Sequence, residues 1–273
     1  MTPRTARRAR RTLPLTGMAV AALLVLSACS SSDDTSPGSA SSASGPAKVS
    51  GTVTVFAAAS LQESFTALGA EFEKAHPGTE VVFNFGGSDT LAASITSGAP
   101  ADVFAAASSR TMAIVTDAKD NASAPVTFAR NQLAIATLPG NPDQVTSLKD
   151  LTKSGLKVVL CDRTVPCGAA AQKALDASGL KLTPVSYEQD VKSALTKVEL
   201  READAAVVYK TDVRAAGDKV EGVDFPESAD AVNDYPIAPL KGAPNAEAAK
   251  AFVTLVRSAE GQKALTEAGF LTP

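Results

Sequence analysis

Short runs of β-branched residues alternate with segments of helical hydrophobic periodicity from about residue 49 onwards. Thr52–Phe56 and Glu80–Phe85 are expected to be strands. A helix between them is indicated by apolar residues spaced three or four apart, namely Leu61, Phe65, Leu68 and Phe72. This alternation predicts an α/β fold in which most strands of a sheet run parallel.

The same alternation continues through the second half of the chain. Further strands are expected to begin at Asp102–Phe104 and to lie at 133–138, 157–161 and 205–209. Further helices are expected around Leu91 and Ile95 and near 169–177, 190–200 and 246–259.

Composition narrows the functions that such a chain can carry. Its 273 residues are 45% hydrophobic and 20% charged, which is typical of a water-soluble globular protein with one large or two medium domains. A single histidine, His76, and three cysteines leave too little material for a zinc cluster or a choice of catalytic triads. Most metal and triad chemistry is therefore excluded.

The N-terminal segment predicts export. Arginines between Arg4 and Arg11 precede an apolar stretch centred on Met18–Leu26, which is typical of a signal peptide over residues 1–28. The stretch ends in Leu26-Ser-Ala-Cys29, which resembles the lipobox of bacterial lipoproteins, so Cys29 is the expected lipidation site. The alternative is an ordinary signal peptide with a chance cysteine. Residues 29–48, rich in Ser, Gly and Pro, are then the anchored cysteine and a flexible linker.

Removal of the signal peptide changes the charge balance. It leaves 21 basic against 29 acidic residues, a net charge of −8. Such an acidic protein is a poor match for nucleic acid or for an anionic membrane surface. We expect no nucleic-acid partner, and contact with the membrane only through the lipid anchor.

Small and polar residues follow three predicted strands at their carboxyl ends. These connections are Ala57–Ser60, Gly86–Ser88 and Asp162–Gly168, and each leads into a predicted helix. Ligands of open α/β sheets bind at this edge, where helix N-termini offer unpaired N–H groups to an anion. The alternative is that Ser60, spaced from Glu63 as in a capping box, and Ser88 only cap their helices.

Several motifs resemble those of periplasmic molybdate-binding proteins, the substrate-binding subunits of molybdate ABC importers. In chain order they are Ala58-Ala-Ser-Leu61, Phe85-Gly-Gly-Ser-Asp-Thr-Leu91, Ser97-Gly-Ala-Pro-Ala-Asp-Val-Phe104, Val165-Pro-Cys-Gly168, Asp190-Val191, Val207-Val-Tyr209 and Asp234-Tyr-Pro-Ile237. The resemblance covers about residues 49–273. It implies a type II periplasmic-binding-protein fold of two α/β lobes, each a mostly parallel sheet flanked by helices, with the ligand in the cleft between them.

The resemblance also implies lobe boundaries and ligand contacts. Lobe 1 would comprise residues 49–128 and 233–273, and lobe 2 residues 129–232. The expected hydroxyl donors to the anion are Ser60, Ser88 and Tyr209, and the expected main-chain N–H donors include Cys167 and Val191.

Two positions depart from the family pattern. Cys167 stands where the family usually has alanine, which matters little if only the backbone donates. Asp89 stands where a small residue is usual, and a carboxylate beside a dianion is unfavourable. Asp89 is therefore expected either to point away from the ligand or to change the selectivity.

Cys161 and Cys167 are the thiols that remain after Cys29 is set aside. In an oxidising compartment such a pair is more often a disulfide than a redox centre. The bridge would either hold the predicted binding loop in place or only stabilise the fold, and the sequence leaves both open.

The predicted function is that of a lipid-anchored receptor outside the cytoplasm, which captures molybdate, and tungstate as well, for an ABC permease. We expect a monomer without enzymatic activity, without a cofactor, and without a metal other than the molybdenum of the oxyanion. The alternatives are a receptor for phosphate or sulfate, a thiol oxidoreductase using Cys161 and Cys167, and a structural or signalling lipoprotein.

Overall fold

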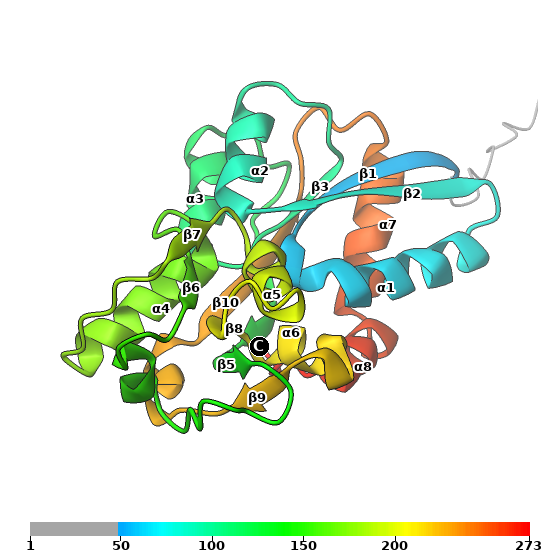
Figure 1. The fold of residues 1–273 in the computed structure, drawn as a ribbon. Coiled ribbons are helices and arrows are strands. Elements are labelled where there is room, and N and C mark those ends of the chain that lie inside the picture. Colours follow the sequence, from blue (N-terminus) through cyan, green and yellow to red (C-terminus); the bar gives the residue numbers. More distant parts are fainter. Residues whose placement is uncertain (1–48) are drawn as a thin grey trace, which may run out of the picture. The chain divides into compact units, whose positions relative to one another are not determined.

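The computed structural model describes residues 49–273, which form two five-stranded β-sheets with helices packed against them (Figure 1). The predicted signal peptide, the lipidation site Cys29 and the linker to residue 48 lie outside the described residues.

The first sheet has the strand order β2-β1-β3-β10-β4. Its strands are β1 (Gly51–Ala58), β2 (Thr79–Gly86), β3 (Val103–Ala105), β4 (Val126–Asn131) and β10 (Asn233–Pro239). β1 pairs in parallel with β2 and β3, whereas β10 is antiparallel to both β3 and β4. Only β10 therefore runs against the common direction of this sheet.

The second sheet has the order β7-β6-β8-β5-β9 and repeats this arrangement. Its strands are β5 (Leu133–Thr137), β6 (Val158–Cys161), β7 (Ser186–Glu188), β8 (Ala205–Tyr209) and β9 (Glu221–Val223). β6 pairs in parallel with β7 and β8, whereas β5 is antiparallel to β8 and β9. The prediction of two mostly parallel sheets is confirmed.

Helices bury both faces of the first sheet. They are α1 (Gln62–Ala75), α2 (Ser88–Thr96), α3 (Ser109–Asp117), α7 (Ala246–Arg257) and α8 (Ala259–Glu267). The short 3-10 helix η1 (Ala59–Leu61) directly precedes α1. One core contains Phe65 of α1 and Phe252 of α7, whose ring centroids are 5.8 Å apart, and a second contains apolar residues of α2 and α3. The helix predicted near 246–259 is α7, which ends at Arg257. A further helix that was not predicted, α8, follows it, and Ser258 caps its start by accepting a hydrogen bond from Gly261 N.

The second sheet has its own core and its own helices. These are α4 (Pro166–Ala177), α5 (Val191–Glu199) and α6 (Lys210–Ala216), with the 3-10 helices η2 (Leu148–Thr152), η3 (Gly217–Lys219) and η4 (Pro226–Ala231). Val191, Ala194, Leu195 and Val198 of α5 are all buried in this core, as the helical periodicity of that segment predicted.

The chain passes between the two sheets at two adjacent places. β4 leads into β5 through Gln132, and η4 leads into β10 through Val232. The two crossings lie side by side, because Asn131 pairs with Asn233 across the β4–β10 ladder. We refer to residues 49–131 and 233–273 as lobe 1 and to 132–232 as lobe 2. The expected boundary between residues 128 and 129 falls inside β4, because that strand keeps its pairing with β10 as far as Asn131.

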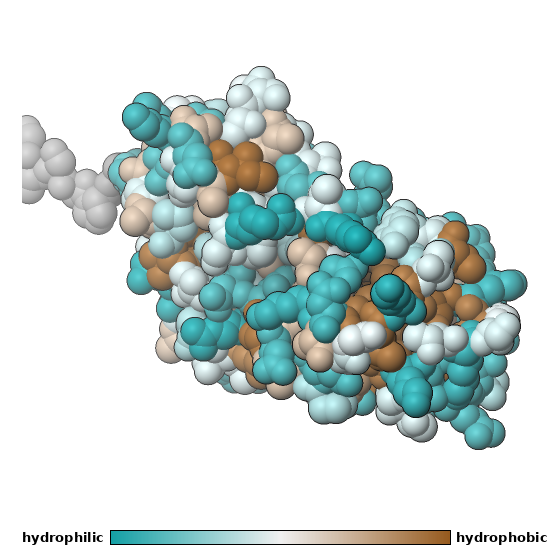
Figure 2. Space-filling view, turned by 90° about the vertical axis from the view of Figure 1, so that its left-hand side faces the viewer, coloured by the Kyte–Doolittle hydropathy of each residue, from teal (hydrophilic) through white to brown (hydrophobic). Residues whose placement is uncertain are grey.

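The surface of the described residues is mixed. The face drawn in Figure 2 shows hydrophilic residues interspersed with smaller hydrophobic groups. Over residues 49–273, no helix combines the length and the apolar character that crossing a membrane would require.

Candidate functional site

A small pocket lies between the two lobes, where strands of both sheets end. Its cavity volume is about 20 Å³, far below the roughly 300–1,000 Å³ of pockets for drug-sized molecules. Its wall consists of Ala58, Ala59, Ser60, Gly86, Gly87, Ser88, Ala107, Val165, Pro166, Cys167, Asp190, Val191 and Tyr209. All five residues that were expected to contact the ligand, Ser60, Ser88, Cys167, Val191 and Tyr209, are among them.

Six connections from a strand to a helix converge on this pocket. They are β1–η1, β2–α2, β6–α4, β7–α5, β8–α6 and β3–α3. The sequence pattern indicated the first three as an anion site. The next two supply Val191 and Tyr209, and the last supplies Ala107. β7 was not predicted because its three residues contain no apolar run. Because strands of one direction end at one edge of a sheet, the topology brings all these helix starts together.

Two helices direct unpaired amides at the pocket. The first intrahelical hydrogen bond of α4 runs from Ala169 N to Val165 O (3.0 Å), so the N–H of Cys167 precedes the bonded part of the helix. The N–H of Val191, the first residue of α5, also precedes the bonded part of its helix, where the bonding begins at Ala194 N. Such amides carry a partial positive charge and are suited to an anion.

Ser88 presents a hydroxyl proton to the pocket. Its side chain is buried, and its Oγ accepts a hydrogen bond from Ala107 N at 3.0 Å. Since the oxygen already accepts, the hydroxyl hydrogen is available to a ligand. The alternative that Ser88 only caps its helix is wrong, because the N-cap of α2 is Gly87 and no side chain caps it.

Gly87 allows the lobes to approach each other beside Ser88. A Cβ atom at Gly87 would lie 2.5 Å from the backbone oxygen of Gln189 in lobe 2. Any larger residue would push the lobes apart, so this position requires glycine.

Ser60 is held by a hydroxyl network. Its Oγ lies 2.8 Å from the Oη of Tyr235 on β10, and Asn131 Nδ2 donates to that same Oη at 3.4 Å. An amide nitrogen can only donate, so the phenol oxygen accepts and its own proton is free to go to Ser60. The hydroxyl of Ser60 can then donate into the pocket.

The predicted capping box of Ser60 and Glu63 is wrong. The residue before α1 is Leu61, and no side chain caps this helix start. Glu63 instead forms an ion pair with Lys192 at 2.7 Å, which leaves Ser60 to Tyr235. Both side chains of the expected capping box, Ser60 and Glu63, form tertiary contacts instead of capping the helix.

Tyr209 is arranged in the same way as Ser88. It is the buried N-cap of α6, and its Oη accepts a hydrogen bond from Asn233 Nδ2 at 2.7 Å. Burial raises the pKa of Tyr209 well above its ordinary value, and burial also raises the pKa of Tyr235. Both phenols therefore stay neutral and keep a proton to donate.

Formal charge is nearly absent from the pocket wall. None of the residues that line it is a lysine or an arginine, and Arg163 is exposed outside the lining. The lining carboxylate, Asp190, accepts from Ser193 N and Ser193 Oγ, both at 2.9 Å. Asp89 is not part of the wall, and its Oδ2 lies 3.4 Å from Thr164 Oγ1 in lobe 2. The expectation that Asp89 could point away from the ligand is thus the one its placement favours.

The disulfide between Cys161 and Cys167 is present. It joins the last residue of β6 to the second residue of α4, with the two Cα atoms 5.8 Å apart. Both cysteines are buried. The bridge therefore ties the residue that bears one of the pocket amides to the neighbouring strand.

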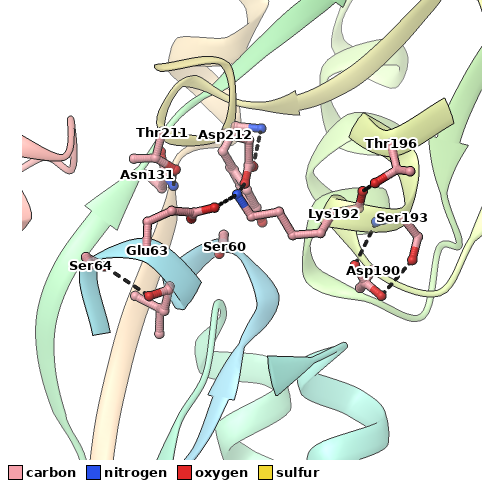
Figure 3. A network of polar contacts seen from close by, with 12 residues as sticks. Ser60, Glu63, Ser64, Asn131, Asp190, Lys192, Ser193, Thr196, Thr211 and Asp212 are labelled. Atoms are coloured by element: carbon pink, nitrogen blue, oxygen red, sulfur yellow. Dashed lines mark hydrogen bonds and ion pairs between the residues drawn. The ribbon is translucent and has the colours of Figure 1, made fainter. Parts of the chain in front are cut away.

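A partly buried ion-pair network lies beside the pocket (Figure 3). The Nζ of Lys192 is 2.7 Å from Glu63 Oε1 and 3.2 Å from Asp212 Oδ1. Asp212 has no exposed side-chain surface, and its Oδ2 accepts from Tyr209 N at 3.1 Å. Burial raises the pKa of Asp212 to about 6, although Lys192 opposes this. Burial lowers the pKa of the partly exposed Lys192, but Asp212 and Glu63 together outweigh it and the net shift is upward.

The sequence analysis missed the residues that support the donors. The hydroxyls are oriented by Tyr235, Asn233 and Asn131. Asp212 contacts the backbone N–H of Tyr209 and pairs with Lys192. Tyr235 was part of a motif noted above but received no role. Polar residues next to a buried apolar run were the available signal, but their partners are distant in the chain and no local spacing reveals them.

The described lobes match a known family along almost their whole length. The family of bacterial extracellular solute-binding proteins matches residues 53–271. The chain belongs to this family. As a solute-binding protein it is a component of transport rather than an enzyme, and its place is outside the cytoplasm.

Named relatives include proteins that carry a specific ligand in their names. The molybdate-binding protein ModA of Mycobacterium tuberculosis is 44% identical over 93% of this chain and 96% of its own. ModA of Escherichia coli is 33% identical over 81% of this chain and 89% of its own. The solved periplasmic molybdate-binding protein of Azotobacter vinelandii aligns with a TM-score of 0.70 over 81% of this chain and 99% of its own, at 20% identity. This last similarity supports the fold, and with it the predicted two-lobed periplasmic-binding-protein architecture.

Because the carboxyl of Asp212 is buried, we expect its contribution to the free energy of unfolding to depend on pH. Its pKa rises from 3.8 to about 6 on folding, so its contribution favours the folded state at low pH and is lost as the pH rises through about 6. The free energy of unfolding of Asp212→Asn, taken relative to that of wild type, should therefore be higher at pH 7 than at pH 4 by on the order of 2 kcal/mol. Urea unfolding at both pH values measures this difference.

The control for this prediction is Asp234→Asn, which removes an exposed carboxylate paired with Arg130. Its difference from wild type should change little over the same pH range. A flat difference for Asp212→Asn would contradict the raised pKa.

Proposed function

We propose that this solute-binding protein captures molybdate, and tungstate as well, and delivers it to the permease of an ABC importer. The observation that carries the proposal is the convergence of neutral donors from both lobes on one small pocket without lysine or arginine in its wall. Three hydroxyls and the amides of two helix starts would surround the anion, each with a hydrogen to donate.

The donor set favours an anion that carries no proton. Phosphate near neutral pH bears a proton and needs an acceptor in its site. The carboxylate in this wall, Asp190, is turned to Ser193 as the cap of α5, with one hydrogen bond to each of its oxygens, and Asp89 lies outside the wall. A fully ionised tetrahedral dianion, which only accepts, fits this arrangement better.

We propose molybdate rather than sulfate as the ligand because the named relatives are molybdate-binding proteins. The two ModA proteins are 44% and 33% identical to this chain over most of its length. Tungstate is included because it has the same charge and tetrahedral shape as molybdate. The role of the five expected contact residues as ligand contacts is part of this proposal, and no cofactor is needed for it.

The family supports a position outside the cytoplasm and a permease partner. We further propose that a lipid on Cys29 holds the protein at the membrane, since the segment before it resembles a lipobox. The monomeric state stays a prediction.

Thermal unfolding with a panel of oxyanions tests the proposed ligand class. Molybdate and tungstate should raise the melting temperature of the protein in a concentration-dependent way, because a ligand that binds only the folded state stabilises it. Sulfate and phosphate at equal concentration should raise it much less. A shift with phosphate alone would replace the molybdate proposal by a phosphate receptor.

Removal of single hydroxyls tests the neutral-donor site. Tyr209→Phe and Ser88→Ala should each raise the dissociation constant for molybdate about 10- to 100-fold, the effect of losing a hydrogen bond to a charged group. Tyr187→Phe removes an exposed hydroxyl and Ser94→Ala a half-buried one, both outside the pocket, and both should leave the dissociation constant unchanged. Titration calorimetry measures all four, and unchanged binding in the first pair would remove these side chains from the site.

The anchor is tested separately. Cys29→Ala should shift the protein from the membrane fraction to the soluble fraction, because it removes the proposed lipidation site. Molybdate binding should stay the same, since Cys29 precedes the folded residues by about twenty positions. Fractionation followed by a high-salt wash measures this, and a variant that remains with the membrane would contradict the anchor.

A further inference from the structure

We propose that Lys192 is a positioning residue that fastens the two lobes in the closed, ligand-holding arrangement by its ion pair with Glu63. This inference rests on the proposed function, because it assigns Lys192 a part in retaining the bound oxyanion. Lys192 itself is not part of the pocket wall.

The ion pair crosses the cleft between the lobes. Lys192 belongs to α5 of lobe 2, and Glu63 belongs to the first turn of α1 in lobe 1. Their charged atoms are 2.7 Å apart, and Figure 3 shows the lysine side chain extended towards Glu63. Because the lobes are joined by the two adjacent crossings near Gln132 and Val232, a rotation about these crossings would separate the pair.

The ammonium also connects the elements that carry the proposed donors. Lys192 directly follows Val191, and Glu63 lies three residues after Ser60. Asp212, the third member, accepts from the backbone N–H of Tyr209. One cation thus links the starts of α1, α5 and α6, each next to a group that faces the pocket.

The surroundings shield one end of this contact. The Lys192 side chain is 19% exposed and that of its second partner Asp212 is 0% exposed, so the ammonium is largely shielded from water, whereas the Glu63 side chain is 51% exposed. Charge pairs that are partly desolvated are weakened less by salt than exposed ones. Asp212 keeps the lysine charged and directed within lobe 2, and Glu63 is the partner that only closure supplies.

Glu63→Ala is the decisive variant, because it breaks the contact between the lobes and leaves Lys192 and Asp212 paired. Its matched control is Glu71→Ala, on the same helix, where Glu71 pairs with Lys74 within lobe 1. Both glutamates have 51% side-chain exposure, so the two changes differ mainly in the partner that is lost.

Stopped-flow and calorimetric titration of the full chain with molybdate measure the effect. Glu63→Ala should raise the dissociation constant about fivefold through faster dissociation, with an association rate within about twofold of wild type. Glu71→Ala should match wild type in both rates. Lys192→Met, combined with Asp212→Asn so that no carboxylate is left buried and unpaired, should raise the dissociation rate as well, and adding Glu63→Ala should then have no further effect.

The outcomes distinguish failure of the Lys192–Glu63 latch, the ion pair that holds the lobes closed, from failure of the proposed ligand. The latch is overturned if wild type binds molybdate and Glu63→Ala releases it at the wild-type rate. It is also overturned if Glu63→Ala raises the dissociation rate further when added to the Lys192→Met and Asp212→Asn variant. If wild type binds none of molybdate, tungstate, sulfate and phosphate, the proposed function fails by itself. In that case small-angle X-ray scattering without ligand tests the latch. Glu63→Ala should increase the radius of gyration because the lobes open, and an unchanged radius would overturn the latch.

Discussion

The pocket depends on a property of every helix start, namely that its first N–H groups have no acceptor within the helix. In this protein several such starts follow strands that run in one direction, so the sheets bring them to a common edge. α4 and α5 contribute the amides of Cys167 and Val191 from lobe 2, and β1–η1 and β2–α2 contribute Ser60 and Ser88 from lobe 1. These unpaired donors lie close enough to share one acceptor only where the two lobes face each other.

The second layer of the site directs the hydroxyl protons. Ser88 accepts from a backbone amide, Tyr209 accepts from Asn233, and Tyr235 accepts from Asn131. Each of these partners is a group that can only donate, so each hydroxyl oxygen is already occupied and its proton points elsewhere. Burial keeps both phenols neutral. A wall built in this way can donate hydrogen bonds without carrying a formal positive charge.

Much of the fold could be predicted from the sequence because its signals are local. The period of the apolar residues indicated α1 and α5, and the β-branched runs indicated β1, β2, β5, β6 and β8. The short strand β7 and the strand β10, which contains Pro236 and Pro239, lack such a pattern and were not predicted as strands. Five of the residues that line the pocket were predicted through the resemblance of motifs, since no single serine or tyrosine could be separated from a helix cap or a core residue by spacing alone.

By itself the sequence determined the alternation of strands and helices, the pairing of Cys161 with Cys167 as the expected bridge, and the edge of the sheets at which a ligand would lie. Only the tertiary structure decided which partner each polar side chain takes. Glu63 pairs with Lys192 across the lobe interface, and Ser60 contacts Tyr235 of β10, which is distant in the chain but belongs to the same lobe. Local spacing encodes secondary structure, since its hydrogen bonds join near neighbours, whereas a hydroxyl or a carboxylate is satisfied by whatever folding brings within about 3 Å.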